Sequence, residues 1–251
     1  LAYEFGGKGA CVVLAARNLE KLTEIVQDLE KLGIQAIAVK TDVTIERDCR
    51  NLIETTIQNF GRIDVMINNA GISMRALFID LQLDVMRRLM DTNYWGTVYC
   101  SKFAIPHLLK TSGSLVGVIS IGGFIGMPGR SGYAASKFAV RGFLDTVRVE
   151  NRKTGLHVLL AAPGFTTSNI RLAALTADGS PQGETPRDEN HMMSAEAVAR
   201  HIYHAVVRRK RQLVLTFFEG KFTVFLGKFV PRYLDRLIYK TFAKEPDSPL
   251  K

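Results

Sequence analysis

Cysteine is scarce in this sequence, which holds only Cys11, Cys49 and Cys100 among its 251 residues. So few cysteines in so long a globular chain exclude a disulfide-stapled scaffold. Their odd number leaves at least one thiol unpaired, and each cysteine is most simply a small buried hydrophobe. No uninterrupted apolar run reaches the ~20 residues of a membrane span. Residues 1–5 also lack the basic start and apolar middle of a signal peptide. We therefore expect a reducing, cytoplasmic compartment, and because Leu1 is not methionine we expect a processed or incomplete start.

Acidic residues are outnumbered, with 24 Asp and Glu against 33 Lys and Arg, which gives a net charge of +9. This balance suits nucleic acid, an anionic membrane surface or a phosphorylated ligand, and charge alone does not choose among them. A composition that is 47% hydrophobic and 23% charged excludes a disordered or collagenous chain. At roughly 100–200 residues per domain, with α/β folds often longer, we expect a single domain.

Short apolar runs rich in valine and isoleucine alternate with longer stretches of helical period, which is typical of βαβ units. The expected strands are Cys11–Ala16, Ile34–Lys40, Val65–Asn68, Leu115–Ser120, Leu156–Ala162 and Gln212–Leu215. The expected helices are Asn18–Lys31, Thr44–Phe60, Gln82–Lys110, Tyr133–Lys153 and Ala195–Val207. Most strands are apolar throughout, as when helices cover both faces of a sheet. The sequence therefore predicts an α/β fold with a doubly wound, Rossmann-like parallel sheet.

Residues Ala174–Asn190 interrupt this periodicity with several Gly, Pro, Ser and Asp residues, a composition typical of a long loop. Ligands of open α/β sheets bind beyond the carboxyl ends of the strands. The loop is therefore either a lid over that crevice or a solvated connector.

Tyr133 and Lys137 carry the sharpest chemical signal. Their spacing of four places the phenol and the ammonium on one face of a helix. A cation beside a phenol favours the phenolate and lowers the tyrosine pKa from ~10 towards a range useful in proton transfer. A tyrosine and a lysine at this spacing also occur by chance on surface helices, so the surrounding residues decide whether the pair has a chemical role. Here Ser120 closes an apolar strand thirteen positions earlier, and a glycine-rich link follows it.

Further motifs surround this pair. One spaced pattern consists of Ser120, Gly123, Pro128, Tyr133 and Lys137. Three others are Asn68-Asn69-Ala70-Gly71, Asn93-Tyr94-Trp95-Gly96 and Pro163-Gly164. Together these motifs strongly resemble those of the short-chain dehydrogenase/reductase family, over about residues 1–215. Ile119 stands where the family often carries a second serine.

The resemblance implies a hydride transfer between a nicotinamide cofactor and an alcohol or carbonyl compound. Tyr133 would exchange a proton with the carbonyl oxygen, and Ser120 would hydrogen-bond that oxygen where charge develops. Lys137 would hold the nicotinamide ribose and lower the tyrosine pKa. Asn93 would anchor a water that passes protons towards Lys137, or would merely satisfy a helix distortion. The remaining residues expected near the cofactor are Asn69, Ala70, Gly71, Pro163, Gly164 and Thr166.

Arg17 indicates which nicotinamide cofactor is used. An acidic residue after the second strand of the family binds the ribose hydroxyls of NAD, whereas an arginine accommodates the additional phosphate of NADP. Arg17 occupies this turn, and a guanidinium can pair bidentately with a phosphate. We therefore favour NADP, the alternative being a solvated arginine at a helix start. Asp42 and Val43 match the pair that contacts adenine in the family.

The family opens with a strand and a Thr-Gly-x-x-x-Gly-x-Gly loop, neither of which is present before Leu1–Phe5. Gly6-Gly7-Lys8-Gly9 is no substitute, because these residues follow an expected helix and precede a strand, as a helix C-terminal turn does. We expect residues 1–215 to form an NADP-binding catalytic domain that lacks about 15–20 residues at its start. Residues 1–251 alone should then be marginally stable and bind NADPH poorly.

Residues 216–251 form a C-terminal extension in which apolar and basic residues interleave. The apolar residues are Phe217, Phe218, Phe222, Phe225, Phe229, Tyr233, Leu237 and Phe242, and the cations are Lys221, Lys228, Arg232, Arg236 and Lys240. This amphipathic pattern suits an anionic membrane surface. It equally suits a segment that covers the core or lines the substrate pocket.

The favoured hypothesis is an NADP-dependent oxidoreductase acting on an apolar, lipid-like or steroid-like, small molecule. The apolar preference depends on the residues near the expected pocket, which are Phe124, Ile125, Met127 and Phe165. The alternative is a non-catalytic member of the family that binds or scaffolds.

Two other features are given less weight. The basic run 208–211 favours a solvated helix end over nucleic-acid binding, because no recognised module accompanies it. His201 and His204 lack a third ligand nearby, so we expect no metal. We also expect a homo-oligomer.

Overall fold

The computed structural model describes residues 1–185, 192–246 and 248–250. Its strands are β1 (Val12–Ala16), β2 (Ala36–Lys40), β3 (Val65–Asn68), β4 (Ser114–Val118), β5 (His157–Ala162) and β6 (Gln212–Val214). Every pairing among them is parallel. The α/β fold with parallel strands is therefore confirmed, and each strand lies within a few residues of its expected position.

Helices connect these strands and continue beyond the last one. They are α1 (Ala2–Gly6), α2 (Leu19–Lys31), α3 (Glu46–Phe60), α4 (Leu83–Leu89), α5 (Gly96–Thr111), α6 (Ser131–Glu150), α7 (Ala195–Val207), α8 (Thr223–Phe229) and α9 (Pro231–Ala243). A π-helical turn, Met90–Trp95, joins α4 to α5 where the sequence predicts one continuous helix. A second π-helical turn, Phe217–Phe222, precedes α8.

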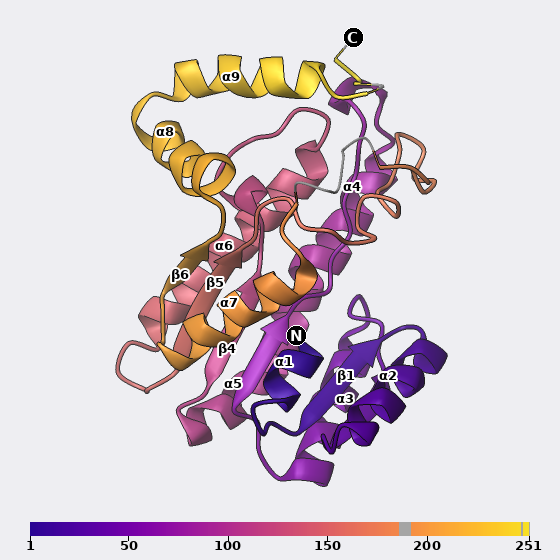
Figure 1. Cartoon of the computed structure of the whole chain (residues 1–251), viewed down its shortest axis with the longest axis vertical. Coiled ribbons are helices and arrows are strands. Elements are labelled where there is room, and N and C mark those ends of the chain that lie inside the picture. Colours follow the sequence, from indigo (N-terminus) through magenta and orange to yellow (C-terminus); the bar gives the residue numbers. More distant parts are fainter. Residues whose placement is uncertain (186–191, 247, 251) are drawn as a thin grey trace.

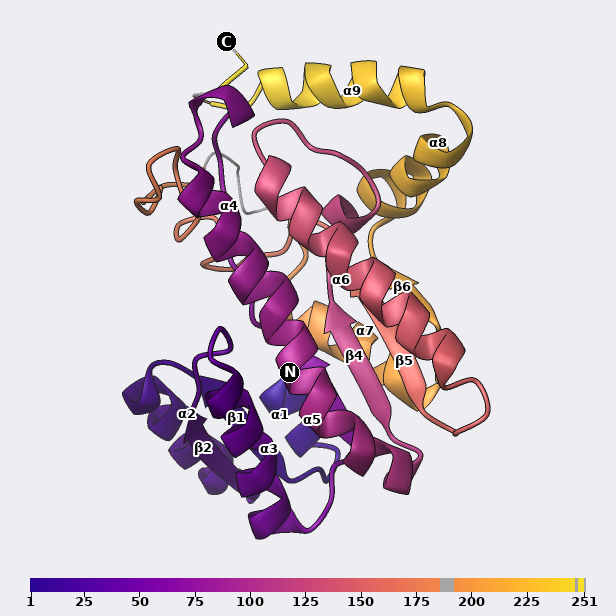
Figure 2. The ribbon, with the colours of Figure 1, turned by 180° about the vertical axis from the view of Figure 1, so that it is seen from behind.

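Helices cover both faces of the larger sheet (Figures 1 and 2). Leu115 and Leu160 point to one face and pack with residues of α5 and α6. Their neighbours Val116 and Leu159 point to the other face and pack with residues of α7. Successive side chains of a strand alternate between faces, so strands buried on both sides are apolar throughout.

The sheet is divided into two parts. One part pairs β1 with β2, and the other runs in the order β3-β4-β5-β6. Among the described residues no strand pairs with the outer edge of β1 or of β3. The helix α1 lies between the two parts (Figure 1), with Phe5 packed near Val65 and Ile67. As expected, the glycines of residues 6–9 end this helix and lead into β1, with Gly9 at a φ of +91°.

A shared core nevertheless joins the two parts. Val39 of β2 and Leu52 of α3 belong to the same buried cluster as Leu108 of α5 and Leu115 of β4. The structure thus agrees with one Rossmann-like domain.

No helix in the described part of the chain combines the length and apolarity needed to cross a membrane.

Candidate active site

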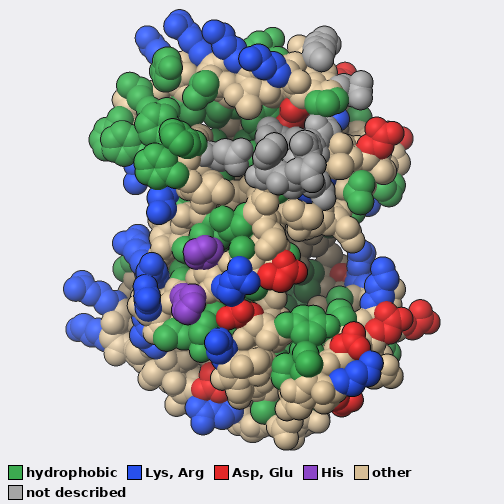
Figure 3. Space-filling view, viewed as in Figure 1, with side chains coloured by type: hydrophobic (Ala, Val, Ile, Leu, Met, Phe, Trp, Pro, Cys, Tyr) green, Lys and Arg blue, Asp and Glu red, His purple; other side chains and the backbone are tan. Residues whose placement is uncertain are grey.

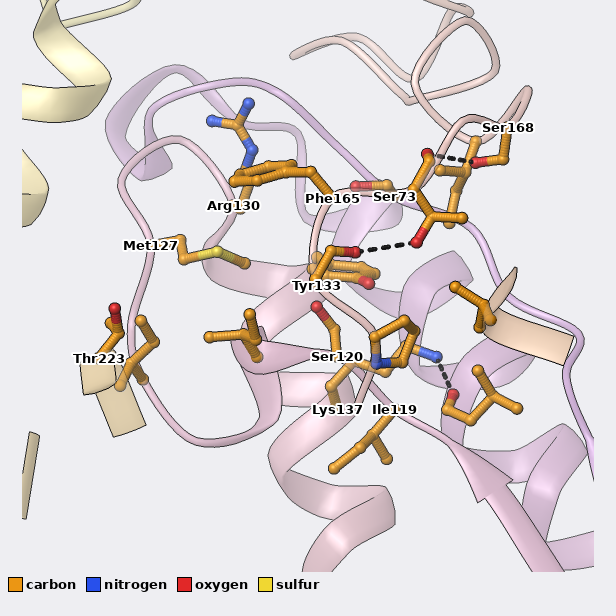
Figure 4. Close-up of a pocket in the computed structure, with 18 of the residues that line it drawn as sticks. Ser73, Ile119, Ser120, Met127, Arg130, Tyr133, Lys137, Phe165, Ser168 and Thr223 are labelled. Carbon is orange, nitrogen blue, oxygen red and sulfur yellow. Dashed lines mark hydrogen bonds between the residues drawn. The ribbon is translucent and has the colours of Figure 1, made fainter. Parts of the chain in front are cut away.

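The carboxyl ends of β3, β4 and β5 open onto one cavity of about 730 Å³. Eight of the residues expected to act in catalysis or hold the cofactor line it, namely Asn69, Gly71, Ser120, Tyr133, Lys137, Pro163, Gly164 and Thr166. They come from segments far apart in the chain and meet because parallel strands all end at the same edge of a sheet. Figure 4 shows Ser120, Tyr133 and Lys137 close together in this cavity.

The side chains of Ser120 and Tyr133 lie close together in this cavity (Figure 4). Ser120 follows β4 and caps a short 3₁₀ turn, Ile121–Gly123, by accepting a hydrogen bond of 3.2 Å from the backbone N–H of Gly122. Tyr133 lies in the first turn of α6 and is 9% exposed. The strand end and the helix start therefore present two hydroxyl groups to the same point of the cavity.

Lys137 lies one helical turn after Tyr133 and is 5% exposed. Its Nζ donates a hydrogen bond of 2.9 Å to the carbonyl oxygen of Val118 and lies 5.8 Å from the centre of the Tyr133 ring. Burial lowers the pKa of Lys137 to about 8, because a charged amine is disfavoured away from water.

The pKa of Tyr133 shifts in the direction opposite to the one expected from the sequence. Burial raises this pKa, and the hydrogen bond with Ser120 and the charge of Arg130 only partly offset the effect. The expectation rested on a nearby lysine cation, which here faces the carbonyl of Val118. The phenol is consequently held in its protonated form, as a proton donor must be.

Asn93 lies outside the cavity lining, within the π-helical turn. Its Oδ1 accepts a hydrogen bond of 2.8 Å from the backbone N–H of Ile72, and its Nδ2 donates to the Ile72 carbonyl at 3.0 Å and to Ser136 Oγ at 2.8 Å. Asn93 thereby fixes the end of the Asn-Asn-Ala-Gly loop against α6. These side-chain contacts run to Ile72 and Ser136, so both expected roles of Asn93, in satisfying a helix distortion and in a water relay, stay predictions.

Arg17, Asp42 and Val43 lie outside the lining of this cavity, at the carboxyl ends of β1 and β2. Arg17 is exposed and directly precedes Asn18, whose Oδ1 caps α2. Burial alone would raise the pKa of Asp42, but hydrogen bonds from Thr44 and the charge of Arg17 bring it below its usual value. The guanidinium of Arg17 therefore lies near the carboxylate of Asp42. Ala70, the other expected cofactor residue outside the lining, is exposed between the cavity residues Asn69 and Gly71.

Comparison with known proteins agrees with this geometry. The model of the family described as short chain dehydrogenase matches residues 1–178 of the chain. Dehydrogenase/reductase SDR family member 7B of Rattus norvegicus is 34% identical over 251 residues, which covers 97% of this chain and 77% of that protein. The chain belongs to the short-chain dehydrogenase/reductase family. As a member of this family it is an oxidoreductase.

Other relatives of this short-chain dehydrogenase/reductase include an Arabidopsis thaliana protein named 11-beta-hydroxysteroid dehydrogenase-like 4A. It is 36% identical over 204 residues, covering 80% of this chain and 68% of that protein. An alcohol dehydrogenase from Thermococcus sibiricus, solved with 5-hydroxy-NADP, is 18% identical with a TM-score of 0.71, over 84% of this chain and 86% of that one. A gluconate 5-dehydrogenase from Burkholderia cenocepacia, solved with NADP and tartrate, is 26% identical with a TM-score of 0.64, over 68% and 67%.

Sequence reasoning missed several residues that line the cavity of this dehydrogenase/reductase. Arg130 directly precedes α6, and Ser73 and Ser168 lie on loops beside the cavity (Figure 4). The segment after β6 also lines the cavity, through the expected Phe218, Phe222, Leu237 and Phe242 and through the unexpected Thr223, Leu234, Ile238 and Thr241. The position of Arg130 three residues before Tyr133 was the available signal for that residue, because such a spacing spans about one helical turn.

The expected loop Ala174–Asn190 contains no helix or strand as far as residue 185, and residues 186–190 lie outside the described residues. Leu175 is buried and donates its N–H to the Ser73 carbonyl at 2.9 Å. The described part of this loop therefore packs beside the cavity, and its action as a lid stays a prediction.

Proposed function

We propose that this protein interconverts an alcohol and a ketone or aldehyde with NADP(H). The observation that carries the proposal is the meeting of Ser120, Tyr133 and Lys137 in one cavity. The cofactor supplies the hydride. Tyr133 gives a proton to the carbonyl oxygen, and Ser120 donates a hydrogen bond to the same oxygen as its negative charge develops.

The residues present suit the nicotinamide half of the cofactor. Lys137 Nζ is buried and, within the described residues, bonds to one acceptor, Val118 O, which leaves donors for the ribose hydroxyls. A Cβ at Gly71 would lie 3.3 Å from Lys137 Nζ and 3.2 Å from Asn93 Oδ1, so glycine lets this loop pass close to the lysine that would hold the ribose. Asn69, Pro163, Gly164 and Thr166 border the same space.

Arg17 supports NADP over NAD. Its exposed guanidinium can form paired hydrogen bonds with the ribose phosphate that distinguishes NADP. The charge of Arg17 contributes to lowering the pKa of Asp42, so the two side chains lie near one another. Val43, the next residue after Asp42, is the second residue expected to contact adenine. The cofactors named for the two solved structures are both of the NADP type.

An apolar substrate is supported by the cavity wall. Its apolar lining includes Ile121, Ile125, Met127, Phe165, Leu234 and Ile238. Apolar walls with a few polar groups at one end bind the body of a lipid-like or steroid-like molecule and orient its single carbonyl. The Arabidopsis relative carries a hydroxysteroid dehydrogenase name, which fits this class.

A membrane surface is the proposed partner of the segment 217–240. Phe218, Phe229 and Tyr233 are 74%, 67% and 62% exposed. Hydrophobic side chains gather over α8, and a row of cations runs over α9 (Figure 3). Aromatic rings beside cations favour the headgroup region of an anionic bilayer. Phe218 and Leu237 are both exposed and part of the cavity lining, so the mouth of the cavity would face the lipid.

Oxidation of NADPH in the presence of a panel of carbonyl compounds tests the proposal. The panel runs from short aldehydes to long-chain aldehydes and steroid ketones, and NADH serves as the matched cofactor. A second form, extended before Leu1 by a strand and a glycine loop, separates weak cofactor binding from absent chemistry. Turnover of an apolar carbonyl with NADPH supports the oxidoreductase, whereas binding without turnover in both forms supports the non-catalytic scaffold.

A further inference from the structure

The residues that follow α9 fold back onto two loops beside the cavity. Pro249 approaches Gly129, where an added Cβ would lie 3.2 Å from its Cγ. Arg75 donates a hydrogen bond to the carbonyl of Pro246. Ser248 is buried. This return of the chain fastens the far end of α9 beside the catalytic helix α6.

At the centre of this contact the carboxylate of Glu245 is buried between two arginines. Its Oε2 lies 3.2 Å from Arg130 Nη2 and 3.8 Å from Arg75 Nη2, and its side chain is 4% exposed. Arg75 follows the Asn-Asn-Ala-Gly loop, and Arg130 directly precedes α6. A charge this deeply buried is stable only when paired, so removing one partner disturbs the others.

Arg130 links the buried carboxylate of Glu245 to the cavity wall. Its Nη1 donates to the carbonyl of Pro128 at 3.1 Å, and its guanidinium lies 4.8 Å from the centre of the Phe242 ring. Arg130 and Phe242 both line the cavity, whereas Glu245 does not. Arg130 and Phe242 thus connect Glu245 to the cavity wall.

We propose that Glu245 is a positioning residue that clamps α9 over the cavity and so selects elongated apolar substrates. The inference rests on the proposed carbonyl reduction and adds what determines substrate length. The beginning of α9 is held independently, because Leu234 packs with Ile121 and Ile125 in a buried cluster. The end of α9, which places Thr241 and Phe242 in the cavity wall, relies on the clamp.

A long substrate reaches past the catalytic hydroxyl groups to the wall formed by α9. A short aldehyde needs only Ser120 and Tyr133. Loosening the end of α9 therefore weakens the binding of long substrates and leaves the chemistry on short ones intact.

Hydrogen–deuterium exchange tests the clamp without cofactor or substrate. Glu245→Gln keeps the size of the side chain and removes its charge. Asp235→Asn is the matched control, because Asp235 is exposed on the same helix. We expect faster exchange at residues 237–243 and 127–130 in Glu245→Gln only, and Glu245→Asp, which keeps the charge, should restore part of the protection. Exchange in Glu245→Gln equal to that of the unmodified protein overturns the proposal.

Steady-state kinetics with NADPH then measure selection by length. For Glu245→Gln we expect the KM of a long-chain aldehyde to rise about tenfold and the kcat for a short aldehyde to stay within about twofold of the unmodified protein. Equal losses on both substrates would show a merely structural role and overturn the proposal. If neither the unmodified protein nor the form extended before Leu1 reduces either aldehyde, the proposed function fails, while the exchange result still decides whether the clamp exists.

Discussion

At the scale of single residues, burial acts on the two titrating groups of the site in opposite directions. It lowers the pKa of Lys137 to about 8 and raises the pKa of Tyr133. At neutral pH the lysine is therefore charged and the phenol protonated, which is the state required to reduce a carbonyl group. As the pH rises through about 8, Lys137 loses its proton first, since the tyrosine pKa lies above its usual value.

We accordingly expect kcat for reduction to decline as the pH rises through about 8, the pKa of Lys137. Lys137→Arg, whose guanidinium stays charged throughout this range, should move the decline to higher pH. Stopped-flow or steady-state NADPH oxidation across about pH 6.5–10 measures both profiles. A profile of the unmodified protein that stays flat through this range would contradict the assignment of Lys137.

Arg17 carries the second prediction at this scale. Arg17→Asp replaces an attraction for the NADP phosphate with a repulsion, so the Kd of NADPH should rise at least about tenfold while that of NADH changes little. Arg152→Asp makes the same charge change at an exposed position after α6 and serves as the control. Fluorescence titration of both cofactors gives the values. Equal affinity of the unmodified protein for NADPH and NADH would refute the preference.

The positions of Ser120, Tyr133 and Lys137 in one cavity were predictable because spaced motifs at strand ends meet at one edge of a parallel sheet. The direction of the Tyr133 pKa was not, since it depends on how deeply packing buries the phenol. The role proposed for Arg130 likewise depends on its ion pair with Glu245, which is more than a hundred positions away in the sequence. No local sequence pattern predicts such a contact.

At the scale of elements, periodicity predicted β3 and α7 with the bounds that the structure gives, Val65–Asn68 and Ala195–Val207. It missed the π-helical turn at Met90–Trp95 because a π-turn adds a residue to the helix without changing its composition. The side chain of Asn93 in this turn bonds to Ile72, and these are long-range contacts that periodicity does not show.

The gap in the sheet is the other element-scale feature. The strands on either side of it, β1 and β3, are only partly buried, whereas β4 and β5 are buried almost throughout. An unpaired backbone group costs about 1–3 kcal/mol when it is buried. A strand placed between β1 and β3 would pair both edges, and a glycine loop after it would lead into the N-terminus of α1.

We expect residues 1–251 alone to be marginally stable and to bind NADPH weakly. An extension before Leu1 that supplies a strand and a Thr-Gly-x-x-x-Gly-x-Gly loop should raise the thermal midpoint and tighten NADPH at least about tenfold, because backbone N–H groups then reach the pyrophosphate. The same extension with its loop glycines changed to alanine should restore stability but not affinity. Thermal unfolding and NADPH titration measure the two effects, and tight binding by residues 1–251 alone would contradict the prediction.

At the scale of the whole molecule, the aromatic and basic surface of α8 and α9 stands at the opposite end from β1 and β2 (Figure 2). Composition predicted that this segment is amphipathic, and the structure shows that it also contributes to the cavity wall. The two readings of the sequence are thus compatible, since one side of the segment packs inward while Phe225 and Phe229 stay exposed.

We predict modest binding to anionic vesicles of phosphatidylserine and phosphatidylcholine, weakening as salt screens the charges over a Debye length. Replacing Phe225 and Phe229 together by serine should reduce this binding several-fold, because neither ring lines the cavity. Phe78→Ser removes an exposed ring elsewhere and is the control. Vesicle flotation at low and high salt measures the effect. Equal binding to neutral and anionic vesicles at low salt would contradict this prediction and would favour a segment that only covers the core and lines the cavity.

The central claim is that Tyr133 supplies the proton during carbonyl reduction. Tyr133→Phe keeps the packing of the ring and removes the transferable proton, and Tyr3→Phe makes the same change at an exposed position on α1. The decisive measurement is kcat for NADPH oxidation with an apolar carbonyl substrate, alongside thermal unfolding of each variant. We predict that Tyr133→Phe lowers kcat by about 10²–10⁴ with an unchanged thermal midpoint, and that Tyr3→Phe changes neither value. A Tyr133→Phe variant that reduces the substrate at nearly the unmodified rate would contradict the account.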